Sequence, residues 1–163
     1  MNSRPDAQGA LEKYRRLAGT YDQLVRPARG VRSRAIERLD LKPGDIVLDV
    51  ACGTGLSFSL LEERIGRQGT LIGIDMSPEM LEKARARVAE AGWANVQLIE
   101  AAIEDVKIPG KADAALFHFT HDVLRTPAAL RTVLGHLGPG ARTRRLRLGR
   151  SRATAGSPQF PRW

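Results

Sequence analysis

Residues 47–55 read VLDVACGTG, and this stretch decides the fold. Its branched apolar residues form a run too short for a buried helix, which is typical of a strand covered on both faces in a parallel sheet. Gly53 and Gly55 follow, and glycine suits a sharp turn or a backbone that a ligand approaches closely. A helix that begins there presents free N–H groups and the positive end of its dipole. The stretch therefore predicts a strand, a turn and a helix around a crevice, the place where doubly wound sheets bind nucleotides.

Strands and helices alternate on both sides of this stretch. Ser77 and Gly92 are suited to cap a helix that starts at Pro78. The predicted strands are residues 46–50, 70–75, 96–100 and 113–119, and the predicted helices are 55–65, 78–91 and one that starts at 126–127 and ends before 138. Residues 6–40 carry apolar side chains at helical spacing. The pattern predicts an α/β protein with a Rossmann-like, doubly wound parallel sheet and a helical N-terminal extension.

The glycine pattern narrows the ligand. A dinucleotide fingerprint requires a third glycine three residues after Gly55, and that position is Phe58. The Gly-Lys-Ser/Thr ending of a phosphate-binding loop is also absent. Asp49 would lie unfavourably beside a pyrophosphate and suits a ligand that carries an ammonium group. Asp75 ends the second predicted strand 20 residues after Gly55, the interval expected for a carboxylate that binds ribose hydroxyls.

The segments VLDVACGTG and GIDMSPEML resemble the first two motifs of the class I S-adenosylmethionine-dependent methyltransferases. The first motif runs from a strand through an acid to Gly-x-Gly, and only its first glycine is replaced, by Ala51. The second motif ends a strand with an acid, here Asp75. The resemblance covers roughly residues 10–140 and is similar in detail to the small-molecule group related to quinone and phospholipid methyltransferases. It implies S-adenosyl-L-methionine as the cofactor, a small-molecule acceptor and no metal.

The resemblance also implies a role for individual residues. The residues expected to hold the methionine end of the cofactor are Asp49, Ala51, Gly53 and Gly55. The ribose is expected at Asp75 and the adenine at Met76. Ala102 stands where the family often has an acid for the adenine amino group, and Ile103 offers a backbone N–H there. The residues after the fourth strand are His118, grouped with the cofactor site, and His121 and Asp122, the candidates for catalysis.

Several of these residues also have a plain structural interpretation. Asp75 could cap the next helix, His118 could pack in the core, and His121 and Asp122 could cap the helix that follows. Cys52 is interpreted as a small packing residue, because the motif places no base beside it. Methyl transfer needs mainly alignment of the acceptor and exclusion of water, with a base only where the acceptor keeps its proton until attack.

The last part of the chain differs in composition from the rest. Seven of the 26 basic residues and none of the 18 acids lie after residue 140, so residues 1–140 are nearly neutral and nucleic-acid binding is unlikely for them. Arginines fill the place of the family's fifth strand, and burying unpaired guanidinium groups there is prohibitive. We therefore expect the family's C-terminal strands to be missing, the fourth strand to be an exposed edge, and homo-oligomers to form through it.

The predicted organisation is a helical segment at residues 1–40, a cofactor-binding core at 41–140 and an arginine-rich tail at 141–163. A shifted reading frame after about Gly140 is one hypothesis for the tail, and a basic arm for nucleic acid or an anionic membrane is the other. With one cysteine, no apolar run long enough for a membrane helix and no secretory leader pattern, we expect a cytoplasmic protein. Methyl transfer to a small molecule is the first functional hypothesis. A cofactor-binding remnant without activity and a nucleic-acid binder that uses the tail are the alternatives.

Overall fold

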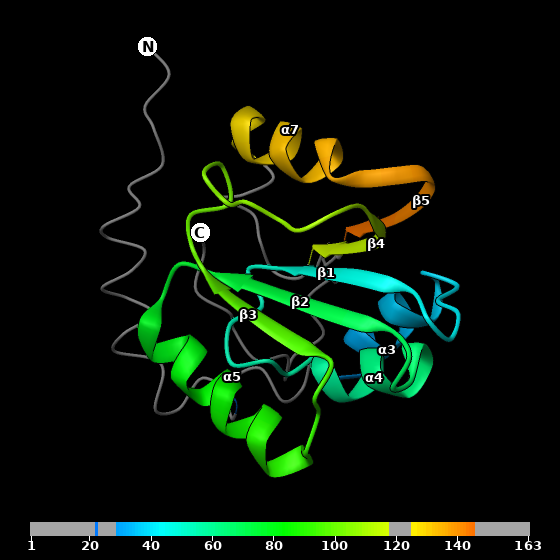
Figure 1. Ribbon diagram of the computed structural model, residues 1–163, viewed down its shortest axis with the longest axis vertical. Helices are drawn as coiled ribbons and strands as arrows, with labels where there is room; N and C mark the ends of the chain where they lie inside the picture. Colours follow the sequence, from blue (N-terminus) through cyan, green and yellow to red (C-terminus); the bar gives the residue numbers. More distant parts are fainter. Residues whose placement is uncertain (1–21, 23–28, 118–124, 146–163) are drawn as a thin grey trace, which may run out of the picture.

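A computed structural model describes residue 22, residues 29–117 and residues 125–145 of the chain. Its centre is a five-stranded sheet of β1 (Ile46–Val50), β2 (Thr70–Asp75), β3 (Val96–Glu100), β4 (Ala112–Phe117) and β5 (Leu137–Arg145), labelled as in Figure 1. The strand order is β3-β2-β1-β4-β5, and every neighbouring pair is parallel. The chain order reverses between β1 and β4, which creates the topological switch point where doubly wound sheets bind ligands. The predicted α/β architecture is confirmed.

Helices cover both faces of the sheet. The helices α3 (Arg29–Glu37), α4 (Phe58–Ile65) and α5 (Pro78–Ala91) lie on one face, and α7 (Pro127–Gly135) lies on the other (Figure 1). Successive residues of β1 point to opposite faces of the sheet. Val47 packs in the core with α3, α4 and α5, and Leu48 packs in the core with α7. With both faces covered, β1 and β2 are buried along most of their length and do not alternate with exposed polar residues.

Local signals set the bounds of α5. The Ser77 hydroxyl accepts a hydrogen bond from the Met80 N–H at 3.3 Å, and Pro78 occupies the first turn. Gly92 ends the helix with a φ of 68°, in the left-handed region that glycine adopts without strain. The helix after the first motif is shorter than predicted. It starts at Phe58, because residues 51–57 form turns.

The fifth strand forms, which corrects one prediction. β5 runs beside β4 with Ala114 opposite Arg142 and Leu116 opposite Arg144, so within the described residues β4 is an inner strand. The Arg142 guanidinium donates to the Asp45 carboxylate and to the backbone carbonyl of Asp40. For Arg142, the expected penalty for a buried, unpaired arginine does not arise, because its strand lies at the edge of the described sheet and its side chain reaches a polar turn.

The described sheet therefore ends at β3 on one side and at β5 on the other. Association of chains through an exposed edge stays a prediction. None of the described helices is long and apolar enough to cross a membrane.

Candidate functional site

The candidate site lies where the carboxyl ends of β1 and β2 meet the turn that leads to α4. Ala51, Gly53 and Gly55 all have positive φ, at 56°, 57° and 76°. The Cys52 N–H donates to the Ile74 carbonyl at 2.9 Å, which attaches the turn to the end of β2. These contacts hold the turn (residues 51–57, here the glycine turn) over the ends of the strands, as the sequence predicts.

Two glycines make room for the close packing under this turn. A Cβ atom on Gly55 would lie 2.6 Å from the ring of Phe58, which is fully buried. A Cβ atom on Gly73 in β2 would lie within 3.0 Å of side-chain atoms of Leu98, Phe58 and Cys52. Cys52 therefore packs beneath the turn, and burial raises the pKa of its thiol well above its usual range. A thiol in this state is a packing residue and a poor nucleophile, which agrees with its interpretation from the sequence.

Asp49 is a buried carboxylate. It is 1% exposed, and among the described residues neither of its oxygens has a hydrogen bond of normal geometry. Burial raises its pKa from 3.8 to about 7, and the nearby charge of Asp75 also raises it. The Arg32 guanidinium and the Ser57 hydroxyl act in the opposite direction. A buried polar group that lacks partners costs free energy, so such a group in a cleft is a candidate for ligand binding.

Asp75 holds the glycine turn from the end of β2. Its Oδ2 accepts from the Gly53 N–H at 2.8 Å and its Oδ1 accepts from the Ser77 N–H at 2.9 Å. Burial raises its pKa, while the hydrogen bonds from Ser77, Gly53 and Met76 lower it. Each carboxylate oxygen has a second lone pair, so Asp75 can still accept hydrogen bonds from the hydroxyls of a ligand.

The pair of carboxylates fits a ligand that has a cationic group and a sugar. An ammonium group would neutralise Asp49 and supply the donors that its two oxygens lack. A pyrophosphate would instead meet two carboxylates. The residues present therefore fit the amino acid end and the ribose of S-adenosylmethionine, and the role of each residue stays a prediction.

The other predicted site residues are distributed around this corner or fall outside the described part. Met76 follows Asp75 directly and is half-buried. Ala102 is also half-buried, and the side chain of Ile103 lies in the core on the α7 face, so only its backbone is available to a ligand. His118, His121 and Asp122 lie outside the described residues, and their roles stay predictions. No cluster of three or more metal-binding side chains occurs within the described ranges.

One part of the site was not predicted from the sequence. The Thr54 hydroxyl donates to Asp22 Oδ1 at 2.6 Å, and Arg87 Nη2 donates to Asp22 Oδ2 at 2.8 Å. Arg87 Nε also donates to the Thr54 carbonyl at 3.1 Å. The three hydrogen bonds link Asp22, Thr54 and Arg87 in a closed ring at the glycine turn. Thr54 belongs to the quoted motif, but nothing in the local sequence marks Asp22 or Arg87 as its partners.

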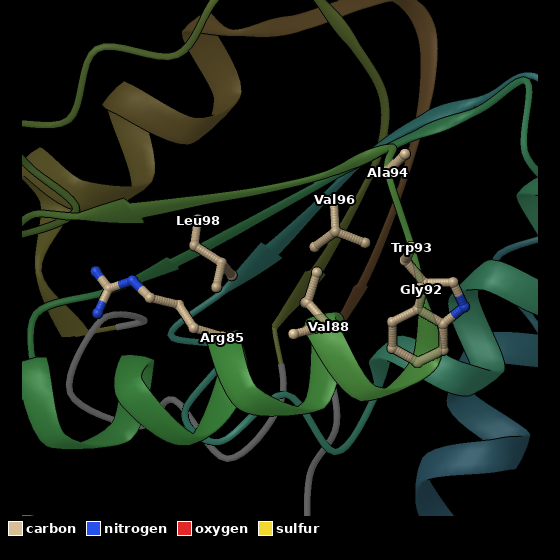
Figure 2. Close-up of a pocket in the computed structure, with 8 residues that line it drawn as sticks. Arg85, Val88, Gly92, Trp93, Ala94, Val96 and Leu98 are labelled. Atoms are coloured by element: carbon tan, nitrogen blue, oxygen red, sulfur yellow. The ribbon is translucent and has the colours of Figure 1, made fainter.

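A shallow hollow elsewhere on the molecule is separate from this site. It lies between α5 and the edge strand β3, where Val88, Val96 and Leu98 face it with Arg85 at its rim and Trp93 at its end (Figure 2). None of the residues that line it is a predicted site residue. The buried carboxylate of Asp49 and the glycine turn, rather than this hollow, form the candidate site.

Comparison with known proteins agrees with the geometry. Residues 47–140 match the methyltransferase domain family. The chain is 38% identical over 86 residues to nocamycin O-methyltransferase of Saccharothrix syringae, covering 52% of this chain and 31% of that protein. It is 31% identical over 137 residues to 2-phytyl-1,4-naphtoquinone methyltransferase of Trichormus variabilis, covering 79% of this chain and 60% of that protein.

A solved structure extends the likeness to the fold. The DhpI–SAM–HEP complex superposes with a TM-score of 0.69 at 25% identity, covering 88% of this chain and 66% of the other. The chain spans less than two thirds of the length of both curated relatives described above. Residues 47–140, which match the family, include the glycine turn and both carboxylates.

Proposed function

Since the chain belongs to the methyltransferase domain family, we propose that it transfers a methyl group from S-adenosylmethionine to a small-molecule acceptor. The observation that supports this most directly is the buried carboxylate of Asp49 beside the glycine turn, for which the described part of the chain supplies no hydrogen bond of normal geometry. The nocamycin and naphtoquinone relatives favour a small acceptor that carries a hydroxyl group or a quinone-derived ring.

The chain's residues would bind the cofactor in two parts. Asp49 takes the ammonium group, and the turn of Ala51, Gly53 and Gly55 lies against the methionine end. Asp75 binds the ribose with the lone pairs that Gly53 and Ser77 leave free. Met76, Ala102 and the Ile103 backbone lie at the adenine end, and His118, the residue that follows β4 in the sequence, is proposed to contact the cofactor as well.

The protein's catalytic contribution is orientation. S-adenosylmethionine supplies a methyl group on a cationic sulfur, which keeps the bonding electron pair and leaves as a neutral thioether when the acceptor bonds to the methyl carbon. The chain must hold the acceptor in line with that bond and exclude water. Where the acceptor keeps its proton until attack, a base is required, and His121 or Asp122 after the carboxyl end of β4 would accept it.

Calorimetric titration with S-adenosylhomocysteine, the demethylated cofactor, tests this proposal. We expect the full chain to bind it, and Asp75→Ala to weaken binding about 100-fold, because both the ribose contact and the Gly53 anchor are lost. The control is Glu90→Ala, which removes an exposed carboxylate in the last turn of α5, at the end of that helix that is far from Asp75. Absence of binding by the wild-type chain, or equal binding by Asp75→Ala, would contradict the proposal.

Turnover is tested separately with radiolabelled S-adenosylmethionine and a panel of hydroxynaphthoquinones, phenols and carboxylic acids. Label in an organic-extractable product supports methyl transfer to a small molecule. Binding of the cofactor without label transfer to any acceptor would instead support a binding protein that has lost its activity.

A further inference from the structure

A closed ring of hydrogen bonds among Asp22, Thr54 and Arg87 holds the glycine turn at its central residue, Thr54. Thr54 stands between Gly53 and Gly55 and is 1% exposed. Its hydroxyl and its backbone carbonyl are both used, the first by Asp22 at 2.6 Å and the second by Arg87 at 3.1 Å. The central residue of the turn is therefore fixed through its side chain and its main chain at the same time.

The ring joins three distant parts of the chain. Asp22 and Thr54 are 32 residues apart, and Arg87 lies a further 33 residues on, in α5. The side chains of Asp22 and Arg87 are 39% and 35% exposed, so solvent screens their ion pair and its main value is geometric. Arg87 presents Nε and Nη2 to two different acceptors, which is a use of the planar guanidinium that lysine could not reproduce.

The residues on either side of Thr54, Gly53 and Gly55, belong to the candidate cofactor site. The Gly53 N–H, next to Thr54, donates to Asp75 at the end of β2. Gly55, on the other side of Thr54, has a positive φ and lies against the Phe58 ring. Asp75 therefore holds the turn at Gly53, and the ring of Asp22, Thr54 and Arg87 holds it at Thr54. Loosening this three-residue ring would let Gly53 and Gly55 move relative to the ligand.

We propose that Asp22 and Arg87 are positioning residues, which hold the glycine turn through Thr54 in the shape that binds the cofactor. The inference rests on the proposed function, because it concerns the affinity of that same site. Neither residue touches the cofactor in this proposal, and both act through Thr54. A residue of the N-terminal segment thereby determines how tightly the core holds S-adenosylmethionine.

The affinity test uses the full-length chain with S-adenosylhomocysteine as the probe. Thr54→Val keeps the shape of the side chain and removes the hydroxyl. Asp22→Asn removes the negative charge and leaves one acceptor oxygen for the two donors, Thr54 and Arg87. Each is expected to weaken binding about tenfold, the effect of losing one charge-assisted hydrogen bond. Combining them is expected to cost little more than either alone, since both break the same ring.

Three controls separate positioning from general loss of stability. Thr54→Ser restores the hydroxyl and is expected to bind within about twofold of wild type. Thr132→Val removes a threonine hydroxyl bonded at 3.1 Å to the Glu104 carbonyl on the opposite face, and it should leave affinity unchanged. Arg85→Gln removes another arginine of α5, one that pairs with Glu100 at 3.7 Å, and it should also bind normally.

A second readout does not require any ligand. Hydrogen exchange of the ligand-free protein should show faster exchange across residues 51–57 in Thr54→Val and Asp22→Asn than in wild type or Thr132→Val. If wild type binds the probe and both ring variants bind it equally well, the inference is overturned and the proposed function stands. If wild type does not bind, both fall. Melting temperatures that drop in the ring variants, with affinity and exchange of the turn unchanged, would show a purely structural ring.

Discussion

Replacing Asp49 with asparagine is expected to stabilise the ligand-free protein at neutral pH. Burial raises the pKa of this carboxyl from 3.8 to about 7, so the folded state binds a proton more tightly than the unfolded state. A shift of about 3 units corresponds to roughly 4 kcal/mol, since one unit is about 1.4 kcal/mol. Asparagine has a similar shape and never ionises, so it avoids this cost.

The sign of the pH dependence follows from the raised pKa. Between about pH 4 and pH 7 the folded protein holds more protons on Asp49 than the unfolded chain does, so wild-type stability falls as the pH rises through this window. Above about pH 7 both states have lost the proton and the cost is constant. The free energy of unfolding of Asp49→Asn, minus that of wild type, should therefore grow by roughly 4 kcal/mol from pH 4 to pH 8.

Urea unfolding at several pH values in this range, followed by tryptophan fluorescence, measures the difference directly. Taking the change with pH removes the constant effect of exchanging a carboxyl for an amide. Asp105→Asn is the matched control, because that carboxylate is exposed, and its difference from wild type should stay flat. A difference for Asp49→Asn that also stays flat, or that shrinks as the pH rises, would refute the reasoning.

The same carboxyl predicts that cofactor binding depends on pH. Only ionised Asp49 attracts an ammonium group, and a pKa of about 7 leaves about a tenth of it ionised at pH 6. Binding of S-adenosylhomocysteine should be about tenfold weaker at pH 6 than at pH 8. Calorimetry at the two pH values checks this, and equal affinities would show that Asp49 does not meet the ammonium group.

Three further substitutions test the packing around the site, each by urea or thermal unfolding. Ala51→Gly should stabilise the protein by about 1 kcal/mol, because Ala51 has a φ of 56° that glycine adopts without strain; a loss of stability would contradict this. Gly73→Ala should destabilise it by about 1–3 kcal/mol, because the new Cβ would lie 2.9 Å from the buried Phe58 ring; an unchanged melting temperature would show that the space is larger. Arg142→Gln should cost about 1 kcal/mol through its contact with Asp45, and the loss should shrink in high salt; a loss independent of salt would argue against the ion pair.

Much of the fold could be predicted from the sequence, because its signals are local. β1, β2 and β3 have the predicted bounds, since each is a short apolar run between turn residues. α5 begins at Pro78 after the Ser77 cap and ends before Gly92 for the same reason. The carboxylates Asp49 and Asp75 could also be identified from the sequence, because they lie at or next to the carboxyl ends of two neighbouring parallel strands.

What could not be predicted depends on contacts between distant residues. The arginines within residues 142–145 argue against a buried strand, because buried arginine needs a partner. Arg142 has a partner because the fold places Asp45 beside the edge of the sheet. The partners of Thr54 lie 32 and 33 residues away in other elements. The sequence also cannot show that no donor in the described ranges bonds to Asp49 in normal geometry, because this depends on which donors the fold leaves out of reach.

The most direct test is electron density from crystals of this chain grown with S-adenosylhomocysteine. We expect the amino group of the ligand within hydrogen-bond distance of Asp49, and its ribose hydroxyls within the same distance of Asp75. Density that leaves this corner empty, or that places the ligand in the hollow beside β3, would contradict the assignment.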